Sequence, residues 1–242
     1  MRYLVYIALL YVIIGCNPDG AGCFKSTGPE ETVLVNTPAF TQIDVSSNID
    51  VRIIPDNTGS ITLTTGANLI PGIRIEVVEG ILYLDNLNTC NFTRKYVNPL
   101  VEISTTDLKA ITLHGFGNIV STDTLRYDQL ELASEGGSGE FRIMVNVRKL
   151  TVGSNNLANF EISGYADELS AGIYWSDCVI SCENLKVKTA YVNHNGSNTI
   201  HLNVSNSISG SINNLGNVIL HQQMPTQINV NETSNGKLIY NP

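Results

Sequence analysis

One short phrase recurs along the chain, and its copies read Gly117-Asn118-Ile119, Gly139-Glu140-Phe141, Ala158-Asn159-Phe160, Asp177-Cys178-Val179, Asn198-Thr199-Ile200, Gly216-Asn217-Val218 and Gly236-Lys237-Leu238. Each copy has a small residue, one variable position and a large apolar residue, which we call the anchor. The anchors lie 22, 19, 19, 21, 18 and 20 positions apart. A period of about 20 residues predicts a stack of similar structural units. Most of the small residues are Gly, Asn or Asp, which tolerate the positive φ of a sharp corner.

Apolar and polar residues alternate within each unit. Phe141, Ile143 and Val145 alternate after one anchor, and Leu130 and Leu132 alternate before it. Alternation with period two marks a strand buried on one face, and no stretch keeps the spacing of an amphipathic helix. The sequence therefore predicts an all-β fold, a single-stranded, right-handed parallel β-helix with two strands in each rung of about 20 residues. We expect the anchors to stack in one interior column and the residue before each anchor, including Cys178, to point outward.

The N-terminus has the features of a bacterial lipoprotein signal. Arg2 precedes an apolar run from Tyr3 to Ile14, which is too short to span a membrane and ends at Gly15-Cys16. Ile14 departs from the usual lipobox, which has a small residue there. We expect a lipoprotein signal peptide over residues 1–15 and acylation of Cys16; the alternative is an ordinary signal peptide with an incidental cysteine. Cys16 would then anchor the exported chain to the cell envelope, at the periplasmic or surface face of the outer membrane.

The rest of the chain divides into a tether and one domain. Residues 16–37 carry Gly, Pro, Asp and Ser without periodicity and are predicted to form the tether. Residues 38–242 are predicted to form the β-helix. Its period extends back through apolar residues spaced 20, 21 and 19 positions apart, namely Ile43, Leu63, Leu84 and Ile103. We expect these N-terminal rungs to be less regular and to form a modified cap.

Composition excludes some classes of function. Hydrophobic residues make up 43% of the chain and charged residues only 15%, which is typical of a β-rich extracytoplasmic protein rather than a disordered one. The net charge of -8 and the absence of a basic cluster longer than Arg94-Lys95 argue against a nucleic-acid partner.

Several further segments resemble one known family. They are the lipobox, Gly22-Cys23-Phe24-Lys25 with Gly28-Pro29, Phe40-x-x-Ile43, Gly80-Ile81-Leu82, Asn88-Thr89-Cys90-Asn91-Phe92-Thr93-Arg94 and the Gly-x-apolar rungs. Together they resemble the auto-transporter adhesin head GIN domain family of Bacteroidetes-type envelope lipoproteins, over essentially the whole mature chain. Phe92 stands where Trp is common in the family. The resemblance implies a β-helical fold and an envelope location, and it implies no particular ligand or reaction.

No catalytic or metal-binding constellation stands out in the sequence. His114, His194, His201 and His221 lack the spacing of metal ligands on a helix. Acidic pairs such as Asp123 with Asp128 or Asp167 with Glu168 are close in sequence only, whereas acid–base work on a sugar needs converging carboxyls. We therefore predict no catalytic residues, no metal site and no cofactor.

The remaining cysteines suggest one disulfide. Cys178 and Cys182, if on one strand, are separated by about 13 Å, which is too far for a bond. Cys23 and Cys90 remain, each in an irregular segment, and the envelope is an oxidising compartment. We predict that they form a disulfide that pins the tether to the first rungs.

Trp175, the only tryptophan, is the candidate binding residue together with Tyr174. Counting back four positions from each anchor aligns Trp175 with small or polar residues, namely Gly115, Gly137, Asn156, Gly196, Asn214 and Ser234. An aromatic ring at such a corner would serve as a stacking platform. The alternative is that Trp175 folds over the corner and covers local apolar surface.

These observations favour a non-enzymatic, lipid-anchored adhesin or binding module that presents stacked β faces to a glycan or a surface protein. One alternative is a carbohydrate-active β-helix enzyme whose carboxylates converge only in three dimensions. Another is a structural envelope component that stacks through its open end. The sequence leaves the oligomeric state open.

Overall fold

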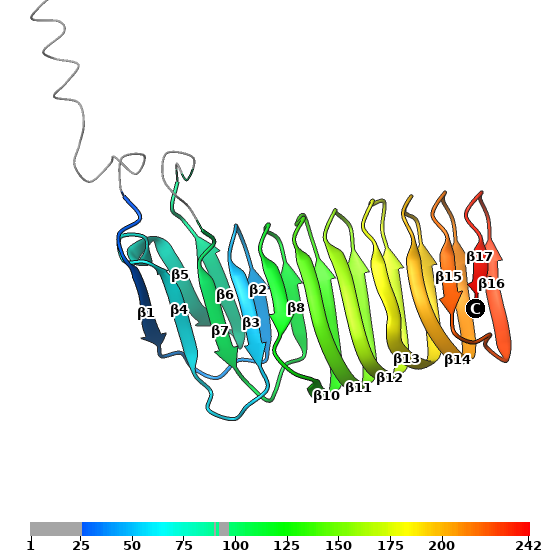
Figure 1. Ribbon diagram of the computed structural model, residues 1–242, viewed down its shortest axis with the longest axis horizontal. Helices are drawn as coiled ribbons and strands as arrows, with labels where there is room; N and C mark the ends of the chain where they lie inside the picture. Colours follow the sequence, from blue (N-terminus) through cyan, green and yellow to red (C-terminus); the bar gives the residue numbers. More distant parts are fainter. Residues whose placement is uncertain (1–25, 90, 92–96) are drawn as a thin grey trace, which may run out of the picture.

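The protein is a parallel β-solenoid in a computed structural model that describes residues 26–89, 91 and 97–242 (Figure 1). Strands stack along one axis, from β1 (Glu30–Val35) at one end to β17 (Leu238–Asn241) at the other. The prediction of an all-β parallel β-helix is confirmed. A short 3-10 turn, η2 (Ile70–Gly72), lies among the strands of the N-terminal part. None of the described helical segments is long and apolar enough to cross a membrane.

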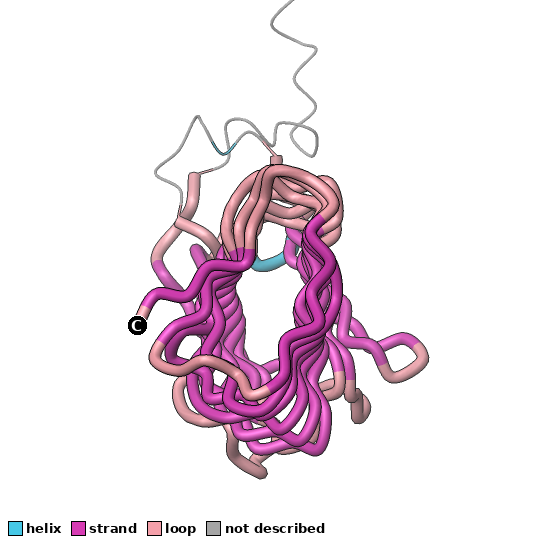
Figure 2. The backbone as a smooth tube through the Cα atoms, turned by 90° about the vertical axis from the view of Figure 1, so that its right-hand side faces the viewer, coloured by secondary structure: helices cyan, strands magenta, loops and turns pink. Residues whose placement is uncertain are grey.

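The central rungs are each built from one long strand and one tight corner. The strands pair in parallel and are β10 (Leu125–Ser134), β11 (Glu140–Ser154), β12 (Asn159–Ile173), β13 (Ile180–His194) and β14 (Ile200–Ile212). Figure 2 shows the strands running along one wall, bending, and continuing along the other wall, with loops closing the opposite edge. The two strands that the sequence predicted in each rung are therefore continuous in β11 to β14. The last strands are β15 (Val218–His221), β16 (Gln227–Glu232) and β17.

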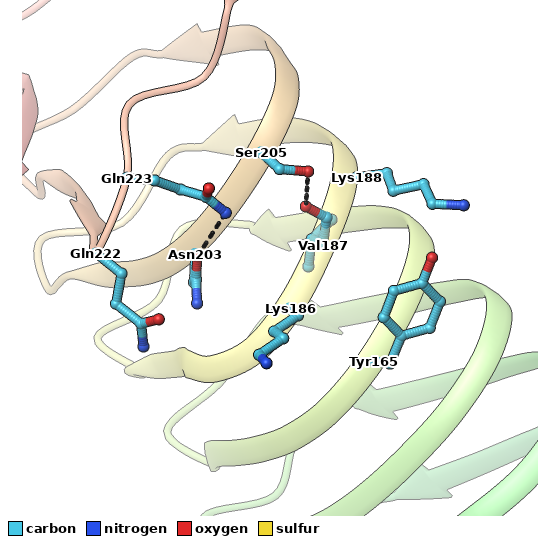
Figure 3. Close-up of a pocket in the computed structure, with 8 residues that line it drawn as sticks. All are labelled: Tyr165, Lys186, Val187, Lys188, Asn203, Ser205, Gln222 and Gln223. Atoms are coloured by element: carbon cyan, nitrogen blue, oxygen red, sulfur yellow. Dashed lines mark hydrogen bonds between the residues drawn. The ribbon is translucent and has the colours of Figure 1, made fainter.

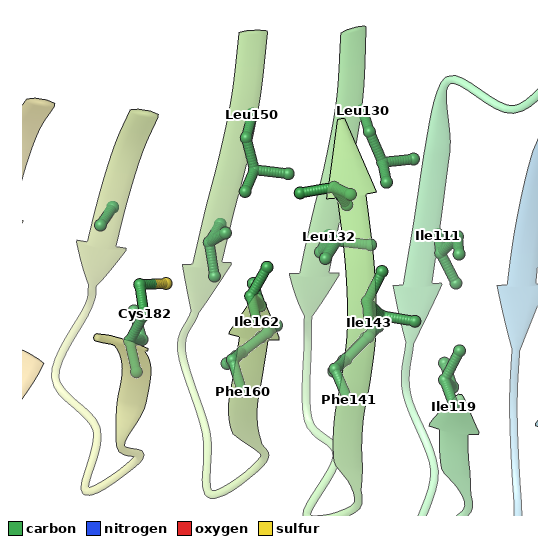
Figure 4. Close-up of a cluster of buried hydrophobic side chains, with 14 of the residues drawn as sticks. Ile111, Ile119, Leu130, Leu132, Phe141, Ile143, Leu150, Phe160, Ile162 and Cys182 are labelled. Atoms are coloured by element: carbon green, nitrogen blue, oxygen red, sulfur yellow. The ribbon is translucent and has the colours of Figure 1, made fainter. Parts of the chain in front are cut away.

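The anchors form the predicted interior column with one exception. Ile119, Phe141 and Phe160 pair directly across neighbouring strands, as Figure 4 shows. The rings of Phe141 and Phe160 stack with centroids 4.6 Å apart and planes 8° apart. Each of these three residues is at most 1% exposed, so the column lies at the centre of the hydrophobic core.

The exception is Val179, because its strand has shifted by one residue. Phe160 pairs with Ile180, and Ile180 pairs with Ile200, so Ile180 is the true anchor. The shift turns Cys178 inward, where it is fully buried, so the prediction that Cys178 points outward is wrong. Cys178 therefore belongs to the column of small residues, in the place assigned to Asp177.

The small residues before the anchors have a different cause from the one that the sequence suggested. The glycines of these copies do not have positive φ. Instead, successive corners pass very close to one another: a Cβ on Gly117 would lie 1.7 Å from the Ile49 carbonyl oxygen, and one on Gly139 would lie 1.8 Å from that of Gly117. A side chain is excluded at Gly117 and Gly139 because there is no space for it, and not because of the backbone conformation.

The N-terminal rungs do not follow sequence order. One rung, β2 (Gln42–Val45) with β3 (Asp50–Ile54), lies between two later ones. Its neighbours on one side are β6 (Ile81–Asn86) and β7 (Leu100–Ser104), and on the other side β8 (Ala110–Leu113) and β9 (Asn118–Ser121). Ile43, Leu63, Leu84 and Ile103 are all buried, as the pattern predicted. Their strands do not stack in sequence order, because β2 lies between β6 and β8.

Antiparallel strands cap this end of the solenoid. β1 pairs antiparallel with β4 (Ile61–Gly66), and β4 pairs antiparallel with β7. On the other wall, β5 (Ile73–Val78) pairs antiparallel with β6. β1 lies within the range 16–37 that was predicted to be the tether, so the chain joins the sheet before residue 38. An antiparallel cap ends the parallel ladder with edges of a different geometry, which hinders continued stacking.

Candidate binding surface

Trp175 lies in a corner that is one residue longer than most others. Ile173 pairs with Ser154 in the strand before, and Ile180 pairs with Phe160 after the corner. Seven positions thus separate Ile173 from Ile180, against six between Ser154 and Phe160. The backbone accommodates the additional residue at Trp175, whose φ is 56°. The corner before β11 is equally long and places Gly136 at a φ of 88°.

The additional residue changes the predicted alignment of Trp175. Ser176, rather than Trp175, lies against Gly196 of the next rung and belongs to the column of small corner residues. Trp175 is 85% exposed, so it does not cover local apolar surface, and that alternative is wrong. Its indole projects from the corner between β12 and β13.

Tyr174 lies beside Trp175 and rests on a shelf made by two glycines. Gly153 and Gly172 are paired on neighbouring strands. A Cβ on Gly172 would lie 2.6 Å from the Tyr174 hydroxyl oxygen, and one on Gly153 would lie 3.7 Å from the Tyr174 ring. The ring therefore occupies the space that side chains would fill, and about half of it stays exposed. The two glycines position the aromatic ring against the outer face of the sheet.

A shallow groove of about 160 Å³ continues from Tyr174 over this face. Small and polar residues line it, among them Glu131, Glu135, Thr151 and Ser170. Hydroxyl and carboxylate groups thus lie next to an aromatic ring. Such a combination suits a ligand that has both an apolar face and hydrogen-bonding groups.

A second groove, of about 530 Å³, lies where the strands bend (Figure 3). Its lining is Tyr165, Lys186, Val187, Lys188, Asn203, Ser205, Gln222 and Gln223. Gln223 donates a hydrogen bond to the side-chain oxygen of Asn203 at 3.3 Å. The Lys188 ammonium lies 2.6 Å from Asp167 and 5.7 Å from the centre of the Tyr165 ring.

Acidic side chains near these grooves alternate with basic ones along the solenoid. Arg148 binds Asp128 at 2.9 Å and lies 3.8 Å from Glu168, each about one rung away. Lys188 binds Asp167 in the same way. The pairing lowers the pKa of Asp128 and Asp167. Asp128, Asp167 and Glu168 thus face basic side chains on neighbouring rungs and do not form a pair of carboxyls that could act as acid and base.

Two of the four histidines meet in space, which the sequence analysis missed. His201 and His221 approach within 2.9 Å through Nδ1 and Nε2, and Glu183 lies beside both. The signal in the sequence was their separation of 20 positions, which is one rung. Helical spacing does not reveal this pair, because side chains in a solenoid meet at intervals of one rung.

The cysteines divide between described and undescribed parts of the chain. Cys16, Cys23 and Cys90 lie outside the described residues, so the predicted lipidation and disulfide stay predictions. Cys178 and Cys182 are buried and free, as predicted from their separation. Burial raises the pKa of the Cys182 thiol to about 12, so it remains protonated and unreactive at neutral pH.

Comparison with known proteins identifies close structural counterparts. A family model described as "Putative auto-transporter adhesin, head GIN domain" matches residues 39–223. A crystal structure of a "putative adhesin" from Bacteroides fragilis is similar with a TM-score of 0.81 at 18% identity, covering 90% of this chain and 100% of that one. A "putative adhesin" from Parabacteroides merdae is similar with a TM-score of 0.65 at 17% identity, covering 90% and 99%.

A third similar structure carries a different description. It is a "putative lipid binding protein" from Parabacteroides distasonis, with a TM-score of 0.70 at 15% identity, covering 90% of this chain and 99% of that one. At these identities the likenesses show a shared fold. No curated protein matches the chain.

Proposed function

The chain belongs to the auto-transporter adhesin, head GIN domain family, and from this premise we propose that it is a non-enzymatic binding module of the cell envelope. Tyr174 and Trp175 form its ligand platform, and a glycan chain is the ligand. One observation carries the proposal: Trp175 is 85% exposed in a backbone conformation that disfavours it.

The exposed indole of Trp175 adds little to the stability of the fold. A residue with a side chain pays about 1–2 kcal/mol for the left-handed conformation, and an exposed indole gains no burial energy. Strained residues of this kind cluster at functional sites, where binding uses the geometry they impose. Tryptophan and tyrosine are also enriched among the residues that dominate binding energy, because they offer large contact area at small entropic cost.

The neighbouring groove favours a glycan. Sugars have an apolar face of C–H groups and an edge of hydroxyls. An aromatic ring can pack against the first, while Glu131, Glu135, Thr151 and Ser170 can hydrogen-bond the second. In a shallow groove of this kind a linear chain would lie across successive rungs.

Replacing Trp175 by Ala is expected to weaken the affinity for the glycan at least tenfold. The melting temperature should stay nearly unchanged. The removed ring accounts for the lost contact, since one binding hot spot contributes about 2 kcal/mol or more. The measurement is a glycan-array screen with the purified protein, followed by titration calorimetry with the best ligand. Binding that survives Trp175→Ala would contradict the assignment of the platform.

Two further variants separate binding from folding. Trp175→Gly should bind as poorly as Trp175→Ala and be slightly more stable, because glycine adopts a φ of 56° without strain. Phe116→Ala removes another exposed corner aromatic, three rungs away, and should bind like the unmodified protein. If the screen instead finds only surface proteins as ligands, the platform is a protein-docking site and the glycan proposal fails.

The enzyme alternative makes a different prediction. A glycoside hydrolase needs two carboxyl groups on opposite sides of the scissile bond. Among the residues that line the two grooves, Glu131 and Glu135 are the only carboxylates, and they lie on the same face as Tyr174. A bound glycan should therefore stay intact, and the release of reducing ends would contradict a pure binding role.

Export and lipid anchoring at Cys16 complete the proposal. The apolar run up to Gly15-Cys16 supports it, as does membership of an adhesin-type family. Replacing Cys16 by Ala should move the protein from the detergent phase to the aqueous phase and remove the mass of the attached acyl chains. Phase partitioning and intact-mass spectrometry measure both effects. Unchanged partitioning and mass would show that Cys16 carries no lipid.

A further inference from the structure

Three side chains from three neighbouring strands converge on the outer face of the solenoid near its C-terminal end. Glu183 lies on β13, His201 on β14 and His221 at the end of β15. One donor atom of each lies within 4.8 Å of the others. The Glu183 Oε2 atom is 3.7 Å from His201 Nδ1 and 3.9 Å from His221 Nε2, and the two nitrogens are 2.9 Å apart.

The backbone places Glu183 in this cluster through a bulge. Cys182 pairs with Leu202, but the next pair is Lys186 with Asn203, so three residues of β13 have no partner on β14. Bulges of this kind redirect a side chain and are common next to functional sites. Here the bulge puts Glu183 beside two imidazoles instead of on the regular ladder.

Two amide side chains hold the bulge in place. Asn203 and Gln222 donate hydrogen bonds to the Glu183 carbonyl oxygen at 3.5 and 3.2 Å. Gln222 follows His221 directly and has a φ of 67°, so the chain turns sharply just after the second histidine. Asn203 and Gln222 also line the larger groove, which therefore adjoins the cluster.

The contact between the two histidines requires at least one neutral imidazole. Two imidazolium ions could not share a contact of 2.9 Å, because both nitrogens would then be donors. Neutral imidazole is the form that coordinates a metal.

We propose that Glu183, His201 and His221 bind one divalent transition-metal ion of the zinc type. Two imidazole nitrogens and a carboxylate suit Zn²⁺ and its neighbours, whereas Ca²⁺ and Mg²⁺ prefer oxygen ligands. Bonds of about 2.0–2.1 Å at tetrahedral angles place ligand atoms about 3.4 Å apart, so movements of about 0.5 Å suffice. The three side chains are partly exposed, at 44%, 26% and 20% respectively, which leaves the fourth coordination position open to solvent. The site is separate from the Tyr174 platform and does not depend on the proposed function.

The test is a zinc titration of the full chain, purified in detergent and stripped with EDTA. Calorimetry should give one equivalent of Zn²⁺ per chain, and saturating zinc should raise the melting temperature. His201→Ala and His221→Ala should each weaken binding at least about 100-fold, more than typical losses of outer-shell groups. Glu183→Gln keeps the size of the side chain and removes its charge, and it should weaken binding at least about tenfold.

His114→Ala is the matched control, since it removes a partly exposed histidine that lies several rungs away from the cluster. It should retain one equivalent at unchanged affinity. Circular dichroism identifies any histidine variant that fails to fold, and the half-exposed Glu183→Gln keeps the test decisive in that case. Absence of stoichiometric binding, binding that survives His201→Ala combined with His221→Ala, or displacement of zinc by millimolar Ca²⁺ would each overturn the proposal.

Discussion

Replacing Phe141 by Ala is expected to lower the free energy of unfolding by about 3–5 kcal/mol. Phe141 is fully buried, pairs with Ile119 on one side and stacks on Phe160 on the other. The substitution removes the stacking contact and leaves a cavity between rungs whose backbones are held at strand spacing. Because the neighbouring rungs are fixed by their own hydrogen bonds, they cannot close over the cavity. Denaturant unfolding followed by circular dichroism measures the loss.

Two further variants serve as controls for Phe141→Ala. Phe141→Leu keeps much of the apolar volume and should lose clearly less stability than Phe141→Ala. Phe116→Ala removes a phenyl ring that is 65% exposed, and its effect should stay within about 0.5 kcal/mol. A Phe141→Ala protein as stable as Phe116→Ala would contradict the interior column.

The sequence predicted the core well because burial follows a local rule. Alternation with period two identifies the inward side chains of any strand, whatever its neighbours are. Ile119, Phe141 and Phe160 were found in this way. The fourth copy failed because two anchors fit the same phrase: Val179 follows Asp177, and Ile180 follows Cys178. Only the additional residue at Trp175, which no local pattern reveals, decides between them.

The order of the rungs is a non-local property. The apolar spacing of Ile43, Leu63, Leu84 and Ile103 is the same whether rungs stack in sequence or are interleaved. The placement of β2 between β6 and β8 depends on long connections whose paths leave no periodic signal. The sequence does not reveal the antiparallel cap for the same reason, since β4 alternates in the same way as the parallel strands of the rungs.

The candidate sites were predicted only in part. Tyr174 and Trp175 could be found because they break a column of small residues, although the column was misaligned by one position. The glycine shelf beneath Tyr174 depends on the pairing of Gly153 with Gly172 and needed the structure. The approach of Glu183 to His201 depends on a bulge, and bulges have no sequence signature here.

Replacing His194 by Ala is expected to lower the free energy of unfolding by about 2–4 kcal/mol at pH 7.5. His194 is fully buried at the start of a corner. The Gly196 N–H donates to its Nδ1 at 3.2 Å, so its Nε2–H donates to the Asn198 carbonyl at 2.7 Å. The neutral ring thus links two backbone groups of the corner through hydrogen bonds from the interior of the solenoid. Its removal leaves a cavity and two backbone groups without partners.

The same residue should make stability depend on pH. Burial lowers the pKa of His194, although the hydrogen bond to Asn198 opposes this. The unfolded chain titrates near its usual value of about 6.5, so below that pH it binds a proton that the folded protein does not. Stability contributed by neutral His194 is therefore complete above pH 6.5 and falls as pH drops towards the folded pKa, by up to about 1.4 kcal/mol per pH unit.

Urea unfolding of the protein and of His194→Ala between pH 7.5 and 5 measures this contribution. The variant should lose less stability across the interval, because it has no buried imidazole left to protonate at that corner. Burial also lowers the pKa of His201, so His201→Ala serves as the matched comparison and should keep the part of the slope that belongs to His194. Parallel pH profiles for the unmodified protein and His194→Ala would show that the imidazole can be protonated in the folded corner. In that case the Gly196 N–H could no longer donate to Nδ1, and the corner would have to rearrange.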